Sequence, residues 1–371
     1  MTIRDVANFI EEIAPLNYAE DFDNVGLLVG DYTTKITNVL VTLDTLEETV
    51  DEAIKENCNL IVSFHPIIFS GLKKLNGKNY VERVVLKAIK NDIAIYATHT
   101  ALDNSKVGVS ARMSEVLGLQ NIQILIPKKN IIKKLITYVP KAEAEDLRSK
   151  LFSAGAGSIG KYAEASFSFN GMGTFKGNNE SNPSVGEKNH QHQEEETCIQ
   201  VIFESKDESN IIKALLENHS YEEVAYQIIS TENVHQDVGM GMIGELPEAM
   251  SETDFLNYTK MIFNSGCVRH SAIRNKEVKK VAVLGGSGSF AISNAIRQKA
   301  DAYISADFKY HDFFKAEGKI LLTDVGHYES EQFTKNLLVE HLTKKFTSFA
   351  PRLEQGEIIL SEKSTNPIYY L

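Results

Sequence analysis

Four short motifs of histidine and carboxylate residues lie far apart in the chain, each at or just past the end of an apolar run typical of a β-strand. The motifs read Ser63-Phe64-His65-Pro66, His99-Thr100-Ala101-Leu102-Asp103, Asp307-Phe308-Lys309-Tyr310-His311 and Gly326-His327-Tyr328-Glu329-Ser330-Glu331. Because the carboxyl ends of strands in an α/β sheet converge on one edge, residues distant in sequence become neighbours there. Neutral imidazole and carboxylate are ligands that zinc, iron or manganese take. The pattern therefore predicts a divalent metal site.

His327 and Glu331 stand four residues apart at the start of a predicted helix, so their side chains lie on one helix face. This spacing can deliver an imidazole and a carboxylate to one ion, or one ligand to each of two adjacent ions. The alternative is an exposed helix start, where an acidic residue in the first turn complements the helix dipole.

His65 is followed by Pro66, which removes a backbone donor and disfavours the helical region at His65. The strand ladder should end there, and the imidazole should project from the sheet edge, although an edge histidine can also be purely structural. His99, Ala101 and Asp103 share one face if the preceding strand continues, because side chains alternate with period two. The same stretch could equally be only a turn.

A glycine-rich loop, Gly285-Gly286-Ser287-Gly288, joins a predicted strand to a predicted helix. Backbone amides in such a loop, with the amino end of the helix, suit a phosphate group. The loop matches neither the dinucleotide fingerprint nor the P-loop, so a tight strand–helix turn is the alternative. The stretch from Asp307 to His311 is expected either to support the metal ligands or to begin a surface helix.

The elements that must position these residues alternate between strand and helix. The expected helices are 2–14, 46–56, 79–91 and 108–117, and the expected strands between them are 39–43, 60–63 and 93–97. The same rhythm resumes later, with strands at 278–284, 302–305 and 320–323 and helices at 252–265, 290–298 and 329–344. Such alternation is the pattern of βαβ units around a parallel sheet.

The rhythm changes in the middle of the chain, where two strand-then-helix pairs flank a polar stretch at 178–196. The pairs are 134–139 with 141–154, and 197–203 with 208–218. Two such pairs favour a ferredoxin-like module. The sequence thus predicts an α/β protein with an N-terminal half at 1–124, an inserted ferredoxin-like α+β domain at 125–237, and a C-terminal half at 238–371. The glycine-rich segment Val238–Gly244 is the predicted return linker.

The composition bounds the class of protein. A length of 371 residues with 43% apolar content allows two or three domains with their own cores. A net charge of −11, with no basic stretch to offset it, argues against direct nucleic-acid binding. The cysteines Cys58, Cys198 and Cys267 lie far apart, which favours neither a thiolate zinc site nor a disulfide framework. With no long apolar run and no signal-like start, we expect a cytoplasmic protein that does not enter a membrane.

The whole chain resembles the Nif-three-like family of dinuclear-metal proteins, whose members are also named GTP cyclohydrolase 1 type 2 homologues. The resemblance is carried by an ordered set of motifs: Asp23-Asn24-Val25-Gly26-Leu27, His65-Pro66, His99 to Asp103, Gly285-Gly286-Ser287-Gly288 and Gly326 to Glu331. It implies two α/β halves packed together, an inserted domain similar to PII and CutA-type modules, and a toroidal homohexamer. It also implies up to two divalent ions per chain, of zinc, iron or manganese.

Carried over by position, the resemblance implies the metal ligands His65, Asp103, His327 and Glu331, with Asp103 or Glu331 as a bridge. The family usually has His-His-Pro where this chain has Phe64-His65-Pro66. A phenyl ring cannot bind a divalent ion, so the second ion would be weak, absent or held by a substitute. His99 and His311 are the residues expected to compensate.

The first functional hypothesis is a metal-dependent hydrolase acting on a small molecule such as a nucleotide. If the family label applies, the substrate is GTP, attack falls on C8 of guanine and formate is released. His99 or Glu331 would then carry the proton and the Gly285–Ser289 loop would cradle phosphate. The alternatives are a non-enzymatic hexameric scaffold that binds metal or serves regulation, and a phosphoester or nucleotide hydrolase at the same site.

Overall fold

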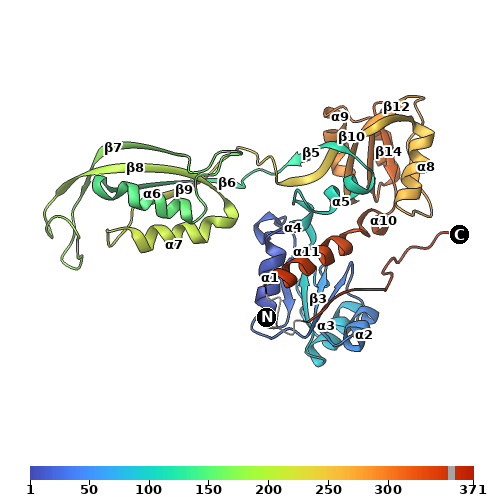
Figure 1. The fold of residues 1–371 in the computed structure, drawn as a ribbon, viewed down its shortest axis with the longest axis horizontal. Coiled ribbons are helices and arrows are strands. Elements are labelled where there is room, and N and C mark those ends of the chain that lie inside the picture. The colour runs from blue at the N-terminus through green and yellow to red at the C-terminus, as the bar shows by residue number, and fades with distance from the viewer. Residues whose placement is uncertain (350–355) are drawn as a thin grey trace. The chain divides into compact units, whose positions relative to one another are not determined.

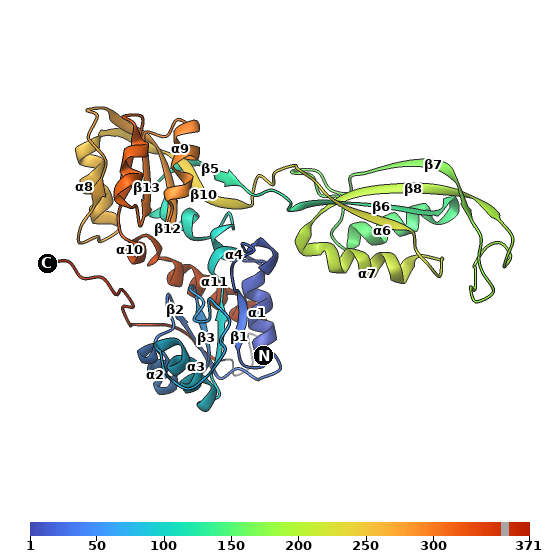
Figure 2. The ribbon, with the colours of Figure 1, turned by 180° about the vertical axis from the view of Figure 1, so that it is seen from behind.

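The computed structural model describes residues 1–349 and 356–371. The chain forms two compact units, one made of Met1–Pro127 with Gln236–Leu371 and the other of Lys128–His235. Figures 1 and 2 show the elements of each unit from opposite sides. The larger unit contains two mixed sheets and the smaller unit one antiparallel sheet, so the predicted mixed α/β fold is confirmed. Within the described residues, no helix is both long and apolar enough to cross a membrane.

The first sheet of the larger unit has five strands. In spatial order they are β1 (Gly26–Val29), β4 (Ala94–Ala97), β3 (Cys58–Ser63), β2 (Asn38–Thr42) and β15 (Ile358–Leu360). The last four run parallel, and β1 is antiparallel to β4. Strands β3 and β4 are almost continuously buried, as expected for parallel strands covered on both faces.

Helices cover both faces of this first sheet. Helices α2 (Glu47–Lys55) and α3 (Tyr80–Lys90) pack against the face that carries Leu40 and Ile61. Helices α1 (Ile3–Glu11) and α11 (Thr334–Phe349) contribute to the cluster on the face of Val41 and Val62. Each fully buried aliphatic side chain contributes roughly 1.5–3 kcal/mol relative to an exposed one. The sheet is therefore a rigid base for residues at its strand ends.

The second sheet has six strands. In spatial order they are β11 (Arg269–His270), β14 (Leu321–Asp324), β13 (Ala302–Ala306), β12 (Glu277–Ser287), β10 (Gly239–Ser251) and β5 (Gln120–Pro127). Strands β12, β13 and β14 are parallel and the outer pairings antiparallel. One face packs on helices α5 (Val109–Val116) and α8 (Glu252–Ile262), the other on α9 (Ile292–Arg297) and the 3-10 helix η5 (Tyr310–Ala316).

The predicted return linker at Val238–Gly244 is wrong. Nearly all of this segment belongs to strand β10, which is paired with β12 on one side and with β5 on the other. Its glycines serve close packing, because a Cβ at Gly239 would lie 2.1 Å from the Ile126 carbonyl oxygen. The glycines of this segment suggested a flexible linker, but in the structure they allow the backbones of β10 and β5 to approach closely.

The smaller unit follows the order β6 (Ile132–Pro140), α6 (Ala144–Ser153), β7 (Ser166–Phe175), β8 (His192–Glu204), α7 (Glu208–Asn218) and β9 (Tyr226–Ser230). Its sheet has the order β7-β8-β6-β9, with every pairing antiparallel. Leu135 and Val201 on the sheet pack with Leu147 and Ile211 on the helices. This βαββαβ order is that of ferredoxin-like modules. Strand β7, which was not predicted, pairs with the polar start of β8.

Candidate metal centre

Strand ends in both sheets of the larger unit position three site residues. His65 follows β3, and its backbone N–H donates to the Leu43 carbonyl (2.9 Å), which keeps it beside the end of β2. His327 and Glu331 lie on the short helix α10 (His327–Glu331), just past β14. Gly326 precedes this helix at a φ of +98°, where a Cβ would lie 2.2 Å from the Glu329 carboxylate. The predicted helix at 329–344 is thus two helices, α10 and α11.

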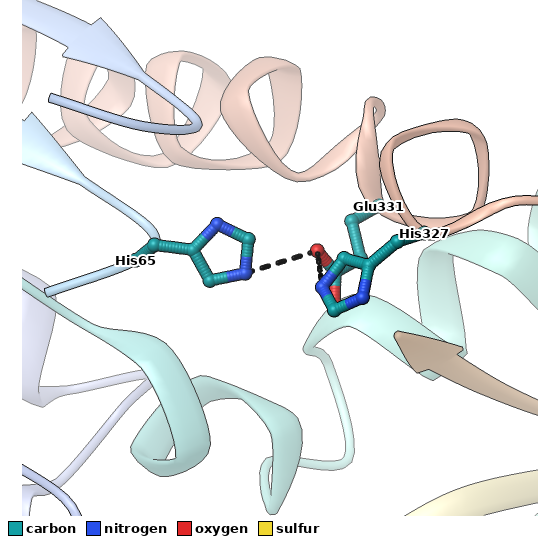
Figure 3. A group of neighbouring side chains, drawn as sticks. All are labelled: His65, His327 and Glu331. Carbon is teal, nitrogen blue, oxygen red and sulfur yellow. Dashed lines mark ion pairs between the residues drawn. The ribbon is translucent and has the colours of Figure 1, made fainter. Parts of the chain in front are cut away.

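The three residues converge on one point. Each offers one ligand atom, and these atoms lie within 4.8 Å of one another. Glu331 Oε2 is 3.2 Å from His65 Nε2 and 3.2 Å from His327 Nε2, and both imidazoles point toward this carboxylate (Figure 3). Two imidazoles and a buried carboxylate are a donor set that fits zinc or a similar divalent ion. The group could hold a metal ion.

The opposite ring nitrogen of each histidine is held by an aspartate. His65 Nδ1 is 2.8 Å from Asp44 Oδ1, and His327 Nδ1 is 2.7 Å from Asp307 Oδ2. An aspartate at Nδ1 favours the tautomer with its proton there, which leaves the Nε2 lone pair facing the shared point. Such carboxylate–histidine pairs are the usual support of metal-binding imidazoles.

Without an ion, the charges around the two imidazoles favour protonation. Burial lowers the pKa of His65, but Asp44 and Glu331 outweigh it and raise that pKa to about 10. Burial likewise lowers the pKa of His327, and Asp307 and Glu331 raise it to about 11. Burial raises the pKa of Glu331, whereas the two imidazoles bring it down to about 2. The carboxylates of the site therefore favour a bound positive charge, either protons on the imidazoles or a metal ion.

The buried oxygen that the two imidazoles share is Glu331 Oε2, on a side chain only 4% exposed. Among the described residues, its contacts are the ion pairs with His65 Nε2 and His327 Nε2, and neither contact has the geometry of a hydrogen bond. A buried carboxylate oxygen without well-formed hydrogen bonds favours a bound cation. An ion lying between this oxygen and the two Nε2 atoms would satisfy all three. The residues present thus fit a divalent ion.

The glycine-rich loop reaches this centre from the second sheet. At Gly286, with φ of +65°, a Cβ would lie 2.4 Å from Glu331 Oε1, and at Gly285 one would lie 2.6 Å from Val109 Cγ1. The Gly286 N–H donates to Ser330 Oγ (2.9 Å), and the Ser287 hydroxyl donates to Asp307 (2.6 Å). These contacts give the loop a packing role beside Glu331. Phosphate binding by Gly285, Gly286, Ser287 and Gly288 stays a prediction.

His99 and Asp103 lie on a helix, which is neither the continued strand nor the simple turn considered from the sequence. Helix α4 (His99–Asp103) begins with His99 at a φ of +27°, a costly conformation for a residue other than glycine. The His99 ring centroid is 5.4 Å from that of His65, and its Nδ1 is 2.8 Å from Asp23. Neither His99 nor Asp103 belongs to the three-residue group.

Asp103 nevertheless lies in the electrostatic field of the centre. Burial raises its pKa well above the usual range, and the charge of Glu331 raises it further, while His65 and His327 oppose this. A carboxyl group in such surroundings is either neutral or close to a cation. Asp103 is therefore a candidate for a further oxygen ligand.

Phe64 and His311 do not contribute ligands. Phe64 is 0% exposed in the core of the first sheet, with its ring centroid 4.9 Å from that of His65 and 5.7 Å from that of His99. The phenyl ring thus packs against both imidazoles from the core of the first sheet. His311 is exposed on η5 beside Tyr310 and Phe314, so it does not compensate for the missing histidine.

The aspartates that orient the histidines were not predicted as site residues. Asp44 lies two residues past the end of β2, as His65 does past β3, so the strand-end argument that found His65 could also have found Asp44. Asp23 was noted only within the motif Asp23–Leu27 that carries the family resemblance, and Asp307 only within a stretch expected to support the ligands or to begin a surface helix. Burial raises the pKa of Asp23, but the hydrogen bonds and charge of His99 and the hydrogen bonds of Thr100 outweigh it and lower that pKa to about 2. The hydrogen bond from His327 outweighs burial and lowers the pKa of Asp307 to about 2.

Known proteins resemble this chain over its full length. The family model described as Duf34/NIF3 (NGG1p interacting factor 3) matches residues 1–367. A GTP cyclohydrolase 1 type 2 homolog from Bacillus subtilis is 36% identical over 371 residues, covering 99% of this chain and 98% of the relative.

Two solved structures share the whole fold. A Bacillus cereus protein related to NIF3 has a TM-score of 0.83 and 34% identity, covering 100% of this chain and 99% of its own. A Staphylococcus aureus protein has a TM-score of 0.76 and 28% identity, with the same coverage. Since the family model and these relatives span essentially every residue, the chain belongs to the Duf34/NIF3 family.

Proposed function

We propose that this protein binds a divalent metal ion through His65, His327 and Glu331 and acts as a metal-dependent hydrolase. One observation carries the proposal. Two Nε2 atoms, each oriented by an aspartate at Nδ1, lie 3.2 Å from one buried Glu331 oxygen, and among the described residues neither contact has the geometry of a hydrogen bond. A divalent ion bound there supplies Lewis acidity toward water or a substrate oxygen.

His99 is the residue we propose for proton transfer. Its Nδ1 is fixed by Asp23, while its ring lies beside His65 and is 19% exposed. Its Nε2 is not engaged by any hydrogen bond within residues 1–349 and 356–371. An imidazole that is oriented on one side and accessible on the other suits general acid–base work. Glu331, proposed from sequence for the same role, is better suited to hold the ion because both ligand histidines face it.

The number of ions is part of the proposal. The three-residue group accounts for one ion of zinc, iron or manganese. A second ion would need Asp103, which faces the same charges, and would lack the histidine that Phe64 replaces. We therefore propose one firmly held ion and a second, weaker one at most.

The substrate is proposed from names alone. Relatives such as the Bacillus subtilis protein are named GTP cyclohydrolase 1 type 2 homologs. Hydrolysis of the guanine ring of GTP is accordingly the first substrate to assay, and a phosphodiester is the second. The inserted ferredoxin-like domain, the homohexamer and the cytoplasmic location belong to this proposal as well.

A non-enzymatic, metal-binding hexameric scaffold is the second candidate. The burial of Phe64 in the core favours it, because the chain holds an apolar ring where the resemblance implies a ligand.

Metal content and turnover test both candidates on the purified full-length chain. Elemental analysis after metal loading should give about one ion per chain, and formate release from GTP or cleavage of a generic phosphodiester should depend on that ion. His327→Ala should abolish both, and His311→Ala, at an exposed histidine outside the group, is the matched control. Bound metal without turnover of either substrate would favour the scaffold. No bound metal would refute both.

A further inference from the structure

A hydroxyl group completes each of the three imidazole–aspartate pairs. Thr100 Oγ1 donates to Asp23 (2.5 Å), and Ser287 Oγ donates to Asp307 (2.6 Å). The third aspartate, Asp44, accepts from Thr365 Oγ1 (2.5 Å). At Asp23 and Asp44 the hydroxyl and the imidazole bind different carboxylate oxygens, whereas at Asp307 both bind Oδ2.

The third hydroxyl comes from a distant part of the chain. Thr100 neighbours His99 and Ser287 ends β12, whereas Thr365 lies beyond β15, in the C-terminal segment Ser361–Asn366. Thr365 and Asp44 are 321 residues apart, so local backbone geometry does not hold them together and other contacts of the segment must do so.

Hydrogen bonds on both sides of Thr365 hold this segment in place. Ser361 N–H donates to the Val41 carbonyl (2.9 Å), which extends the pairing of β15 with β2. The Glu362 N–H donates to Glu52 Oε1 (2.9 Å), and the Lys335 ammonium donates to the Ser361 carbonyl (3.0 Å). Past Thr365, Asn366 Nδ2 donates to Glu329 Oε1 (3.0 Å), on the helix that carries His327 and Glu331.

These hydrogen bonds fix the position of Thr365. The residue is only 6% exposed, and its hydroxyl is directed at Asp44. With Asp44 Oδ2 occupied by this donor, Oδ1 remains for His65 Nδ1. An aspartate bonded at both oxygens has its plane fixed, and it fixes the ring it holds.

We propose that Thr365 is a positioning residue for His65, acting through Asp44, and that the C-terminal segment is thereby part of the metal centre. The inference rests on the proposed metal binding at His65, His327 and Glu331. Loss of the hydroxyl frees Asp44 to rotate toward solvent, and His65 Nε2 loses its fixed direction. Outer partners of this kind typically change metal affinity about 10–100-fold.

The test compares three variants of the full-length chain. Thr365→Val keeps the volume and removes the donor, Thr365→Ser keeps the donor, and Ser364→Ala changes an exposed neighbour in the same segment. Cobalt(II) affinity is measured by competition with a chromophoric chelator, together with the visible spectrum of bound cobalt. We expect Thr365→Val to weaken binding about tenfold and alter the spectrum, with Thr365→Ser and Ser364→Ala within about twofold of wild type.

Crystal structures of the metal-free wild type and Thr365→Val proteins provide a readout that needs no metal. His65 should keep Nδ1 on Asp44 in the wild type and lose that orientation in the variant. Equal affinities for wild type and Thr365→Val, or a Thr365→Ser protein as weak as Thr365→Val, would overturn the inference. A wild type that binds no cobalt would refute the proposed function instead, and an unchanged His65 orientation in the variant would then overturn the inference as well.

Discussion

His65 and His327 share one kind of surroundings, and His99 differs from both. All three imidazoles have Nδ1 within 2.8 Å of an aspartate. Only His65 and His327 face Glu331 with Nε2, at 3.2 Å each. An aspartate at Nδ1 therefore orients an imidazole without deciding its use. A second, buried carboxylate at Nε2 distinguishes a proposed ligand from a proposed proton carrier.

Removing that second carboxylate should have the largest effect. Glu331→Gln keeps the shape but removes the negative charge that both Nε2 atoms face, so metal affinity should fall more than about 100-fold. Chelator competition measures the affinity, and thermal unfolding of the metal-free protein checks the fold. Glu340→Gln, on the exposed face of α11, is the control. A near-normal metal affinity of Glu331→Gln would show that Glu331 does not distinguish His65 and His327 from His99.

Truncating the histidines one at a time should separate the two kinds of surroundings. His327→Ala should lower metal affinity about 100-fold, while His99→Ala should change it less than about threefold and lower turnover instead. Both quantities can be measured on the same preparations. If His99→Ala loses metal as readily as His327→Ala, the two surroundings are equivalent and His99 is a ligand.

The stability of the metal-free protein should depend on pH through the two proposed ligands. In the folded state the pKa of His65 is about 10 and that of His327 about 11, both above the value of 6.5 for a free imidazole. A raised pKa stabilises the fold fully below the unfolded value and loses this contribution as pH rises through the folded value. Thermal unfolding temperatures should therefore fall between about pH 6.5 and pH 11.

The fall of the unfolding temperature with rising pH should be smaller in a ligand variant. In His327→Ala the fall at high pH should be less steep, and excess zinc should suppress the fall in the wild type because zinc takes the place of the protons. Metal affinity itself should rise with pH over this range. A decline of the same steepness in wild type and in His327→Ala would show that other groups cause it.

Restoring a histidine beside the centre should have the smallest effect on the first ion. Phe64→His places an imidazole in a fully buried apolar site, at a stability cost of roughly 1–3 kcal/mol. The metal content should rise toward two ions per chain, because the Phe64 ring lies near both His65 and His99, with ring centroids 4.9 Å and 5.7 Å away. Phe64→Leu separates loss of the phenyl ring from gain of a ligand. An unchanged metal content in a folded Phe64→His protein would contradict the placement of the second ion.

Part of this centre was predictable from strand ends. His65 follows β3 and His327 with Glu331 follows β14, and the helical spacing correctly placed the latter two on one face. Their convergence needs the packing of two separate sheets, which no local pattern encodes. The helix at His99–Asp103 was missed because a positive φ at His99 starts it, a conformation that sequence propensity disfavours.

Other features could not be inferred from the sequence for different physical reasons. The role of Thr365 depends on a tertiary contact across most of the chain. The glycines of β10 indicated a linker, whereas they permit close pairing of strands. The alternating strands and helices were recognisable because burial on both faces requires continuous apolar runs.

The central claim is that one divalent ion binds His65, His327 and Glu331. Anomalous diffraction from zinc-loaded crystals of the wild-type chain tests it most directly. The account predicts a strong peak about 2.0–2.2 Å from His65 Nε2, His327 Nε2 and Glu331 Oε2. A peak bound elsewhere, or no peak at this point in a fully loaded crystal, would contradict it.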